Sequence, residues 1–241
     1  MIILGIDTSC KSTGVALSEG ARLLGQYQLT THNMHSCQVF TLIETLLKAS
    51  NKKMNQVDAI AVTIGPGSFT GLRVGLMTAK TLAHLNKCLL LGISTLEVLS
   101  YPWSQDSQTI YPCIDALRGE VYGAGIQWKS GVPHYVIPGS VYKVQEFCDL
   151  VNKSKEMEDS FVNICGPVGI KNWDHFSRNI KGLVHLDTIG TEVDPGSLCR
   201  YAFEAYTHDR IKSTEVMSLN PVYYRRPEAE IVYDKNHLIV S

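Results

Sequence analysis

The chain lacks a long run of apolar residues and has no excess of charge of either sign. Its 241 residues include 22 Lys and Arg against 23 Asp and Glu, so the formal net charge is −1. This balance does not indicate a polybasic nucleic-acid surface, but it does not exclude a local basic patch. The opening strand-like run 2–6 is too short to cross a membrane, and no basic segment precedes it. We expect a soluble cytoplasmic protein without a membrane partner.

The sequence also lacks the motifs of metal and nucleophile chemistry. It contains no HExxH, HxxxH or GxSxG, and His32 and His35 have no third ligand beside them. The 7 cysteines are widely spaced and form no CxxC, which predicts reduced, mostly buried thiols. We therefore expect no metal, no cofactor and no catalytic residue of the chain's own.

The apolar residues that are present predict α/β structure. Runs at 2–6, 13–17 and 23–29 are strand-like, and the short links between them predict an antiparallel meander. Apolar residues at 39–47 recur at helical spacing, after Ser36 as a possible N-cap. The first half then continues as a strand, a helix and a strand, at 59–64, 72–85 and 89–93.

The second half repeats the opening order. A strand at 110–114 ends in Asp115 and is followed by a second strand-like run at 119–128, as the strand at 2–6 ends in Asp7. This echo predicts two related lobes, at residues 1–104 and 105–241, with a late helix at 198–205 that packs back on the first lobe. Two lobes of this kind resemble the actin-like ATPase fold (ASKHA, ribonuclease H-like).

The turn Asp7-Thr8-Ser9 admits two readings. Its backbone N–H groups and small hydroxyl side chains suit a phosphate, and Asp7 suits a magnesium-bound water. Alternatively, the side chains only cap the strand end with local hydrogen bonds. The residues that follow, Cys10, Lys11 and Ser12, lack the glycine richness of a phosphate loop. An active actin-fold ATPase or kinase would use Asp7 and Thr8, with adenine-binding glycines at 165–169.

The loop 65–71, Gly-Pro-Gly-Ser-Phe-Thr-Gly, joins a strand to a helix whose N-terminus favours anions. It is neither a Walker loop nor a GxGxxG motif. Small residues recur every four positions along the helix, which lets another helix pack closely. That helix is either the chain's own, at 39–47, or one in a partner subunit. The residues of the partner hypothesis are Val39, Leu42, Ile43, Leu46, Gly71, Leu72, Gly75, Leu76, Ala79 and Ala83.

Several colinear segments together resemble the TsaB (YeaZ) family. They are residues 6–9, 65–75, 79–80, 93–97, 115–122 and 221–225. The resemblance implies a role in forming N6-threonylcarbamoyladenosine at adenosine 37 of tRNAs that read ANN codons. It implies a TsaD-like paralogue as heterodimer partner and a TsaE-like P-loop ATPase. The sequence leaves open whether the isolated chain is a monomer or a homodimer, and we expect only indirect or weak contact with tRNA.

The resemblance also separates this chain from TsaD. TsaD-like proteins carry a metal-binding HxxxH, and the two ligand positions here are Thr95 and Leu99. Leucine cannot ligate a metal, and a neutral threonine is a poor substitute for imidazole. The resemblance thus implies a non-catalytic subunit in which the turn Asp7-Thr8-Ser9 is a vestige of a nucleotide site.

Overall fold

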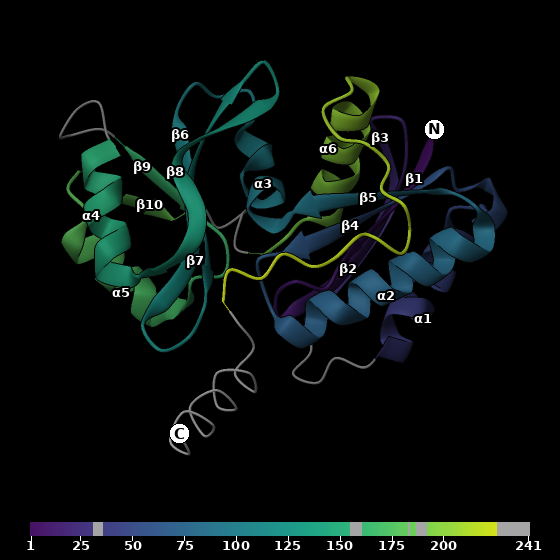
Figure 1. Cartoon of the computed structure of the whole chain (residues 1–241), viewed down its shortest axis with the longest axis horizontal. Coiled ribbons are helices and arrows are strands. Elements are labelled where there is room, and N and C mark those ends of the chain that lie inside the picture. The colour runs from purple at the N-terminus through teal and green to yellow at the C-terminus, as the bar shows by residue number, and fades with distance from the viewer. Residues whose placement is uncertain (31–35, 155–160, 183, 187–191, 226–241) are drawn as a thin grey trace, which may run out of the picture.

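The computed structural model describes residues 1–30, 36–154, 161–182, 184–186 and 192–225. These residues form two five-stranded sheets side by side, with helices on their faces (Figure 1). The histidines at positions 32 and 35, named above as unsupported metal ligands, lie outside the described residues. No helix in the described part is both long and apolar enough to cross a membrane.

The first sheet has the strand order β3-β2-β1-β4-β5. Its strands are β1 (Ile2–Asp7), β2 (Ser12–Glu19), β3 (Arg22–Thr30), β4 (Ala59–Gly65) and β5 (Leu89–Ser94). The first three strands pair antiparallel, which confirms the predicted meander, and β4 and β5 continue the sheet in parallel with β1.

Side chains on β1 alternate between two cores because successive residues of a strand point to opposite faces. Leu4 and Ile6 pack under α1 (Ser36–Ala49) and α2 (Phe69–Asn86), whereas Ile3 packs under α6 (Pro195–Thr207). Figure 1 shows α1 and α2 together on one face of this sheet and α6 on the other. Helices therefore cover both faces of the first sheet, and one of these helices, α6, comes from the C-terminal part of the sequence.

The second sheet has the order β10-β9-β6-β7-β8. Its strands are β6 (Thr109–Asp115), β7 (Glu120–Lys129), β8 (Val132–Lys143), β9 (Val162–Cys165) and β10 (Val184–Leu186). The strands β6, β7 and β8 pair antiparallel, while β9 and β10 extend the sheet in parallel. This is the topology of the first sheet, strand for strand, which confirms the predicted echo. The fold is the two-lobed actin-like fold.

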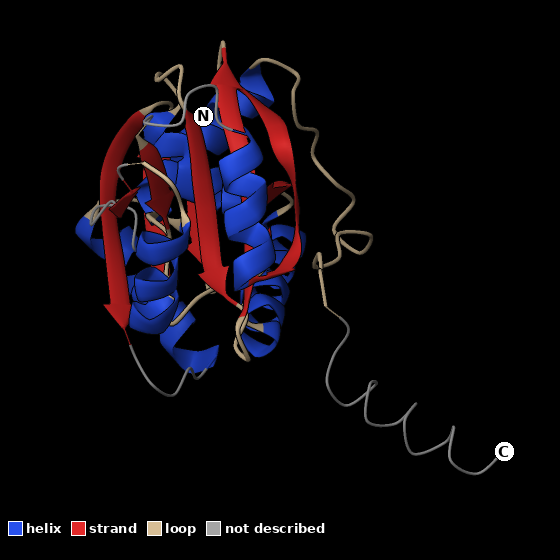
Figure 2. Ribbon diagram, turned by 90° about the vertical axis from the view of Figure 1, so that its left-hand side faces the viewer, coloured by secondary structure: helices blue, strands red, loops and turns tan. Residues whose placement is uncertain are grey.

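Helices α4 (Val144–Ser154) and α5 (Gly169–Asn179) cover one face of the second sheet. Helix α3 (Thr95–Ser100) packs in the core shared by the two sheets, and the short 3-10 turns η1 (Met54–Gln56) and η2 (Tyr101–Trp103) complete the elements. After α6 the tail has neither helix nor strand up to Arg225 and lies outside the layers (Figure 2). The lobe boundary at residue 104 stays a prediction.

Candidate functional site

Asp7 is the last residue of β1, and its side chain is completely buried. Its Oδ1 accepts hydrogen bonds from the Ser9 hydroxyl and the Thr63 hydroxyl, each at 2.6 Å, and from the Ser9 backbone N–H at 3.2 Å. Its Oδ2 has no hydrogen-bond partner among the described residues. Burial raises the pKa of Asp7 from 3.8 to about 6, against the lowering effect of the Ser9 and Thr63 hydrogen bonds.

The glycine-rich loop before α2 closes over this turn. The backbone N–H of Ser68 donates to the Ser9 carbonyl at 2.7 Å, and a Cβ on Gly67 would lie 2.2 Å from that same carbonyl oxygen. Thr8 donates its hydroxyl to the Gly71 carbonyl at 2.7 Å. Thr8 and Ser9 have no exposed surface. The Thr8 hydroxyl therefore donates to a backbone carbonyl, while the Ser9 hydroxyl and backbone N–H donate to the Asp7 carboxylate, as in the local-capping reading of this turn. Its assignment as a vestigial nucleotide turn stays a prediction.

The two positions that correspond to metal ligands in TsaD-like proteins lie in α3. Thr95 and Leu99 are 0% and 2% exposed, and Leu99 belongs to the core between the sheets. The described residues contain no group of three or more His, Cys, Asp or Glu side chains that could hold a metal ion. The glycine Gly166, named above for adenine binding, packs against the Cys113 carbonyl and Leu99.

The small-residue stripe on α2 faces the chain's own core. Gly71, Gly75, Ala79 and Ala83 are all buried, and a Cβ on Gly75 would lie 2.2 Å from Thr8 Oγ1. The other residues of the partner hypothesis are buried as well: Val39, Leu42, Ile43, Leu46, Leu72 and Leu76.

The stripe is buried within the chain, but the helix at 39–47 does not account for all of it. Gly75 lies against Thr8 in the turn after β1, whereas Ala79 and Ala83 belong to the core that α1 also covers. Contact of these helices with a partner stays a prediction. It now depends on their exposed apolar residues Phe40, Met77 and Leu85, which are 44%, 61% and 70% exposed.

A half-buried carboxylate that the sequence pattern does not reveal joins the two lobes. Glu97 on α3 accepts hydrogen bonds from Tyr135 on β8 at 2.8 Å and from Tyr201 on α6 at 2.9 Å. Burial raises the pKa of Glu97 above its ordinary range. The Tyr201 ring also packs edge-on against Trp128 at 5.3 Å. No local motif marks this cluster, because its members come from four elements, α3, β7, β8 and α6, that span more than 100 positions of the sequence.

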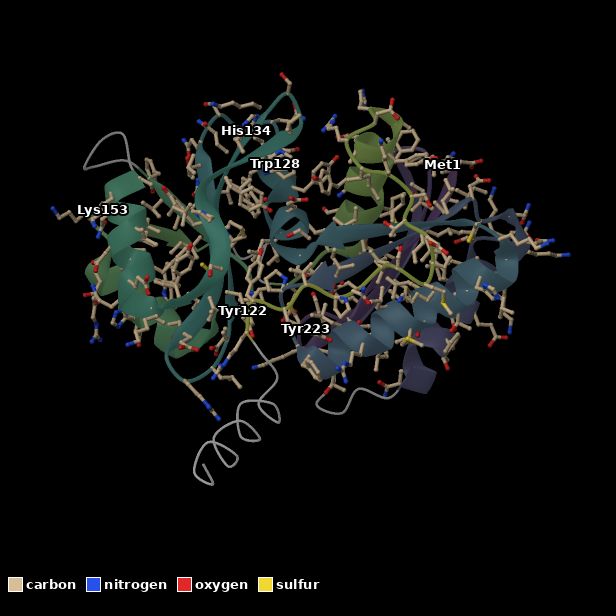
Figure 3. The ribbon with its side chains drawn as sticks, in the orientation of Figure 1. Met1, Tyr122, Trp128, His134, Lys153 and Tyr223 are labelled. Atoms are coloured by element: carbon tan, nitrogen blue, oxygen red, sulfur yellow. The ribbon has the colours of Figure 1, made fainter. Side chains whose placement is uncertain are left out.

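The tail after α6 crosses from the first sheet to the second. Val222 N–H donates to the Ile64 carbonyl at 2.7 Å. The Tyr223 ring packs on Phe69 at 4.8 Å, and Tyr224 packs on Tyr122 at 6.3 Å. Figure 3 labels Tyr122, on β7 of the second sheet, and Tyr223, in the tail that runs beside α2. The tail therefore connects the first turn of α2 with the second lobe.

Comparisons with known proteins agree with this architecture. The family model described as TsaD, tRNA N6-adenosine threonylcarbamoyltransferase, matches residues 29–181. A Bacillus subtilis protein, the tRNA threonylcarbamoyladenosine biosynthesis protein TsaB, is 28% identical over 95% of this chain and 96% of its own length. The Escherichia coli protein of the same name is 33% identical over 53% of this chain and 55% of its own length.

A solved structure of similar fold is YeaZ from Pseudomonas aeruginosa. It is 23% identical, with a TM-score of 0.75, over 92% of this chain and 99% of that one. The chain therefore belongs to the TsaD family and, within it, to the TsaB (YeaZ) group.

Proposed function

We propose that this chain is an accessory subunit in the formation of N6-threonylcarbamoyladenosine in tRNAs that read ANN codons. The observation that carries the proposal is the alignment, across nearly the whole of both chains, with a Bacillus subtilis TsaB protein named for that biosynthesis. In this role the chain binds a TsaD-like catalytic paralogue and acts together with a TsaE-like P-loop ATPase.

The geometry of the turn after β1 supports an accessory role rather than catalysis. Asp7, Thr8 and Ser9 are buried and hydrogen-bonded within the chain. The loop before α2 is held to this turn by the Ser68 N–H and the Ser9 carbonyl, and Thr8 and Ser9 have no exposed surface to offer a phosphate. At the metal-ligand positions, Thr95 and Leu99 supply neither imidazole nor carboxylate. The paralogue therefore supplies the catalytic metal and the donor site.

The exposed apolar residues of α1 and α2 support a partner surface. Met77 and Leu85 are exposed on α2, and Phe40 is exposed on α1. Exposed apolar side chains on neighbouring helices are a feature of protein interfaces. We assign this surface to the paralogue, and to a second copy of the chain when the paralogue is absent.

Reconstitution tests the proposal. The chain, its TsaD-like paralogue and its TsaE-like ATPase are co-purified with and without ATP, and threonylcarbamoyladenosine is measured in tRNA. We expect modification only when all three proteins and the separately supplied threonylcarbamoyl donor are present. Modification at the same rate without this chain would overturn the proposal. ATP turnover by the pure chain that disappears in Asp7→Ala would overturn its non-catalytic part.

A further inference from the structure

The tail after α6 follows a path for which both sheets leave room. Figure 1 shows it, in yellow, running from α6 across the first lobe to β7 of the second. A Cβ on Gly65, the last residue of β4, would clash with the Val222 carbonyl oxygen. In the second sheet, a Cβ on Gly139 of β8 would clash with the Tyr224 hydroxyl. The tail therefore fits against both sheets because each has a glycine where the tail passes.

The first lobe binds the tail as far as Tyr223. Leu219 is only 8% exposed and belongs to the core under α1 and α2. The Val222 N–H donates to the Ile64 carbonyl at 2.7 Å, and the Tyr223 ring lies on Phe69 at 4.8 Å. These contacts fix this part of the tail on β4 and on the first turn of α2.

The second lobe binds the next two residues. The Tyr224 ring packs edge-on against Tyr122 at 6.3 Å. Arg225 donates to the Ala116 carbonyl at 3.2 Å and pairs with Glu120 at 3.3 Å. The side chains of Arg225 and Glu120 are 24% and 31% exposed, so water screens this ion pair less than it screens a pair on the open surface.

The crossing between the lobes has no spare length. Tyr223 packs on the first lobe and Tyr224 on the second, and consecutive Cα atoms lie only about 3.8 Å apart. If the lobes separate at this edge, one of the two rings must therefore leave its contact. The link between η2 and β6, at residues 104–108, is different, because it is a loop that can absorb a change of angle.

A second set of contacts joins the lobes at the other end of β7. Trp128 packs against Tyr201 of α6 at 5.3 Å, and Arg210 donates to the Gly131 carbonyl after β7. Figure 3 shows Tyr122 and Trp128 toward opposite ends of this strand. The rise of a strand puts the two sets of contacts about 20 Å apart. One set alone would let the lobes pivot, whereas two sets this far apart fix the angle between them.

We propose that residues 219–225 form a strap that fixes the angle between the two lobes. Domains joined in one chain ordinarily move relative to each other, and two-lobed folds often open and close about a hinge. In this chain the strap opposes that motion at one end of β7, and the Trp128–Tyr201 contact opposes it at the other. When the strap is released, the lobes pivot about α3, which packs between the sheets. This inference does not depend on the proposed function.

The test measures the relative orientation of the lobes in the full chain. Residual dipolar couplings of backbone amides, recorded in a weakly aligning medium, give an alignment tensor for each lobe. Lobes held at one angle share a single tensor, whereas lobes that move independently have tensors of unequal magnitude. We expect a single tensor for the wild type. We expect two for the double variant Tyr224→Ala/Arg225→Ala, which removes the side-chain contacts of the strap with the second lobe.

Gly139→Ala tests the strap from the second lobe, because it displaces the Tyr224 hydroxyl and leaves the tail sequence unchanged. We expect two tensors for this variant as well. The matched control is Val222→Ala. Its side chain is 41% exposed, and it keeps the N–H that donates to Ile64, so we expect a single tensor. A good fit of each lobe to its own couplings shows that a variant is folded.

Three results would overturn the proposal. The first is two tensors in the wild type, which would mean that the lobes move although the strap is in place. The second is a single tensor in Tyr224→Ala/Arg225→Ala, which would mean that other contacts fix the angle. The third is two tensors in Val222→Ala, because the effect would then not depend on contacts with the second lobe. If the double variant does not fold, Gly139→Ala decides in the same way.

Discussion

Gly75 lies directly against Thr8, with room for a hydrogen atom and nothing larger. A Cβ on Gly75 would lie 2.2 Å from Thr8 Oγ1, which itself donates to the Gly71 carbonyl at 2.7 Å. The closeness of α2 to the turn after β1 thus depends on one glycine and one hydroxyl. Because the turn and the helix fill each other's space, neither can change alone without a loss of packing.

Gly75→Ala should therefore be destabilising, by about 1–3 kcal/mol, as expected for overpacking in a buried contact. Removing the opposing hydroxyl relieves the clash, because the next Thr8 atom, Cβ, lies 3.4 Å from the position of the new Cβ. In a double-mutant cycle of Gly75→Ala and Thr8→Ala, followed by urea unfolding, we expect the double variant to be more stable than the sum of the two single losses predicts. If the losses in unfolding free energy of the two single variants simply add in the double variant, the close contact between Gly75 and Thr8 is contradicted.

Asp7→Asn should stabilise the fold, and more strongly as the pH rises. The pKa of Asp7 is 3.8 in the unfolded reference and about 6 when folded. Because the pKa of Asp7 is raised by folding, its favourable contribution to the free energy of unfolding is fully present below pH 3.8. That contribution is lost as the pH rises through about 6. The difference corresponds to about 3 kcal/mol at full ionisation, partly offset because the new amide N–H lacks an acceptor.

The measurement is urea unfolding of wild type and Asp7→Asn at about pH 4.5 and pH 8. The gain of the variant should be larger at pH 8. Asp149→Asn, at an exposed carboxylate on α4, is the control and should show no such trend. An equal gain at both pH values would mean that Asp7 is not charged in the folded chain at pH 8.

The Glu97 cluster should be sensitive to removal of one hydroxyl. Tyr201→Phe leaves one oxygen of the half-buried Glu97 carboxylate without its partner at 2.9 Å, which should cost about 1 kcal/mol of unfolding free energy. Tyr27→Phe is the matched control, since Tyr27 is 38% exposed on β3. Because the raised pKa of Glu97 reflects burial of the charged form, the loss in Tyr201→Phe should shrink as the pH falls toward the ordinary range of a glutamate. A loss that does not depend on pH would contradict this account.

Much of the fold was predictable because periodicity and short links are local properties. The meander, α1 and the echo between the halves all follow from spacing along the chain. Helix α2 begins at Phe69, three residues before the predicted start, because the Ser68 hydroxyl accepts from the Gly71 N–H and caps it. Helix α4 carries the same kind of signal, with buried residues at 144, 147, 148 and 151, and its boundaries could have been read from that spacing.

The candidate site was less predictable, because small residues spaced four apart on a helix do not reveal which part of the chain packs against them. Gly71, Gly75 and Ala79 identify a face of α2 that permits close approach, but only the fold shows that the turn after β1 lies there. The Glu97 cluster depends on long-range contacts among α3, β8 and α6, which no local pattern encodes.

The opposite faces of α2 should respond in opposite ways to substitution. Gly75→Leu and Ala79→Leu place bulky side chains in a buried contact, so we expect both variants to melt early. Met77→Glu changes a side chain that is 61% exposed, so its melting temperature should stay within a few degrees of the wild type. If α1 and α2 contact the paralogue, Met77→Glu buries an unpaired charge in that interface and should abolish co-purification and tRNA modification. Phe161→Glu, exposed on the other lobe, is the control and should retain both. Normal binding by Met77→Glu, with Phe40→Glu also normal, would place the interface away from these helices.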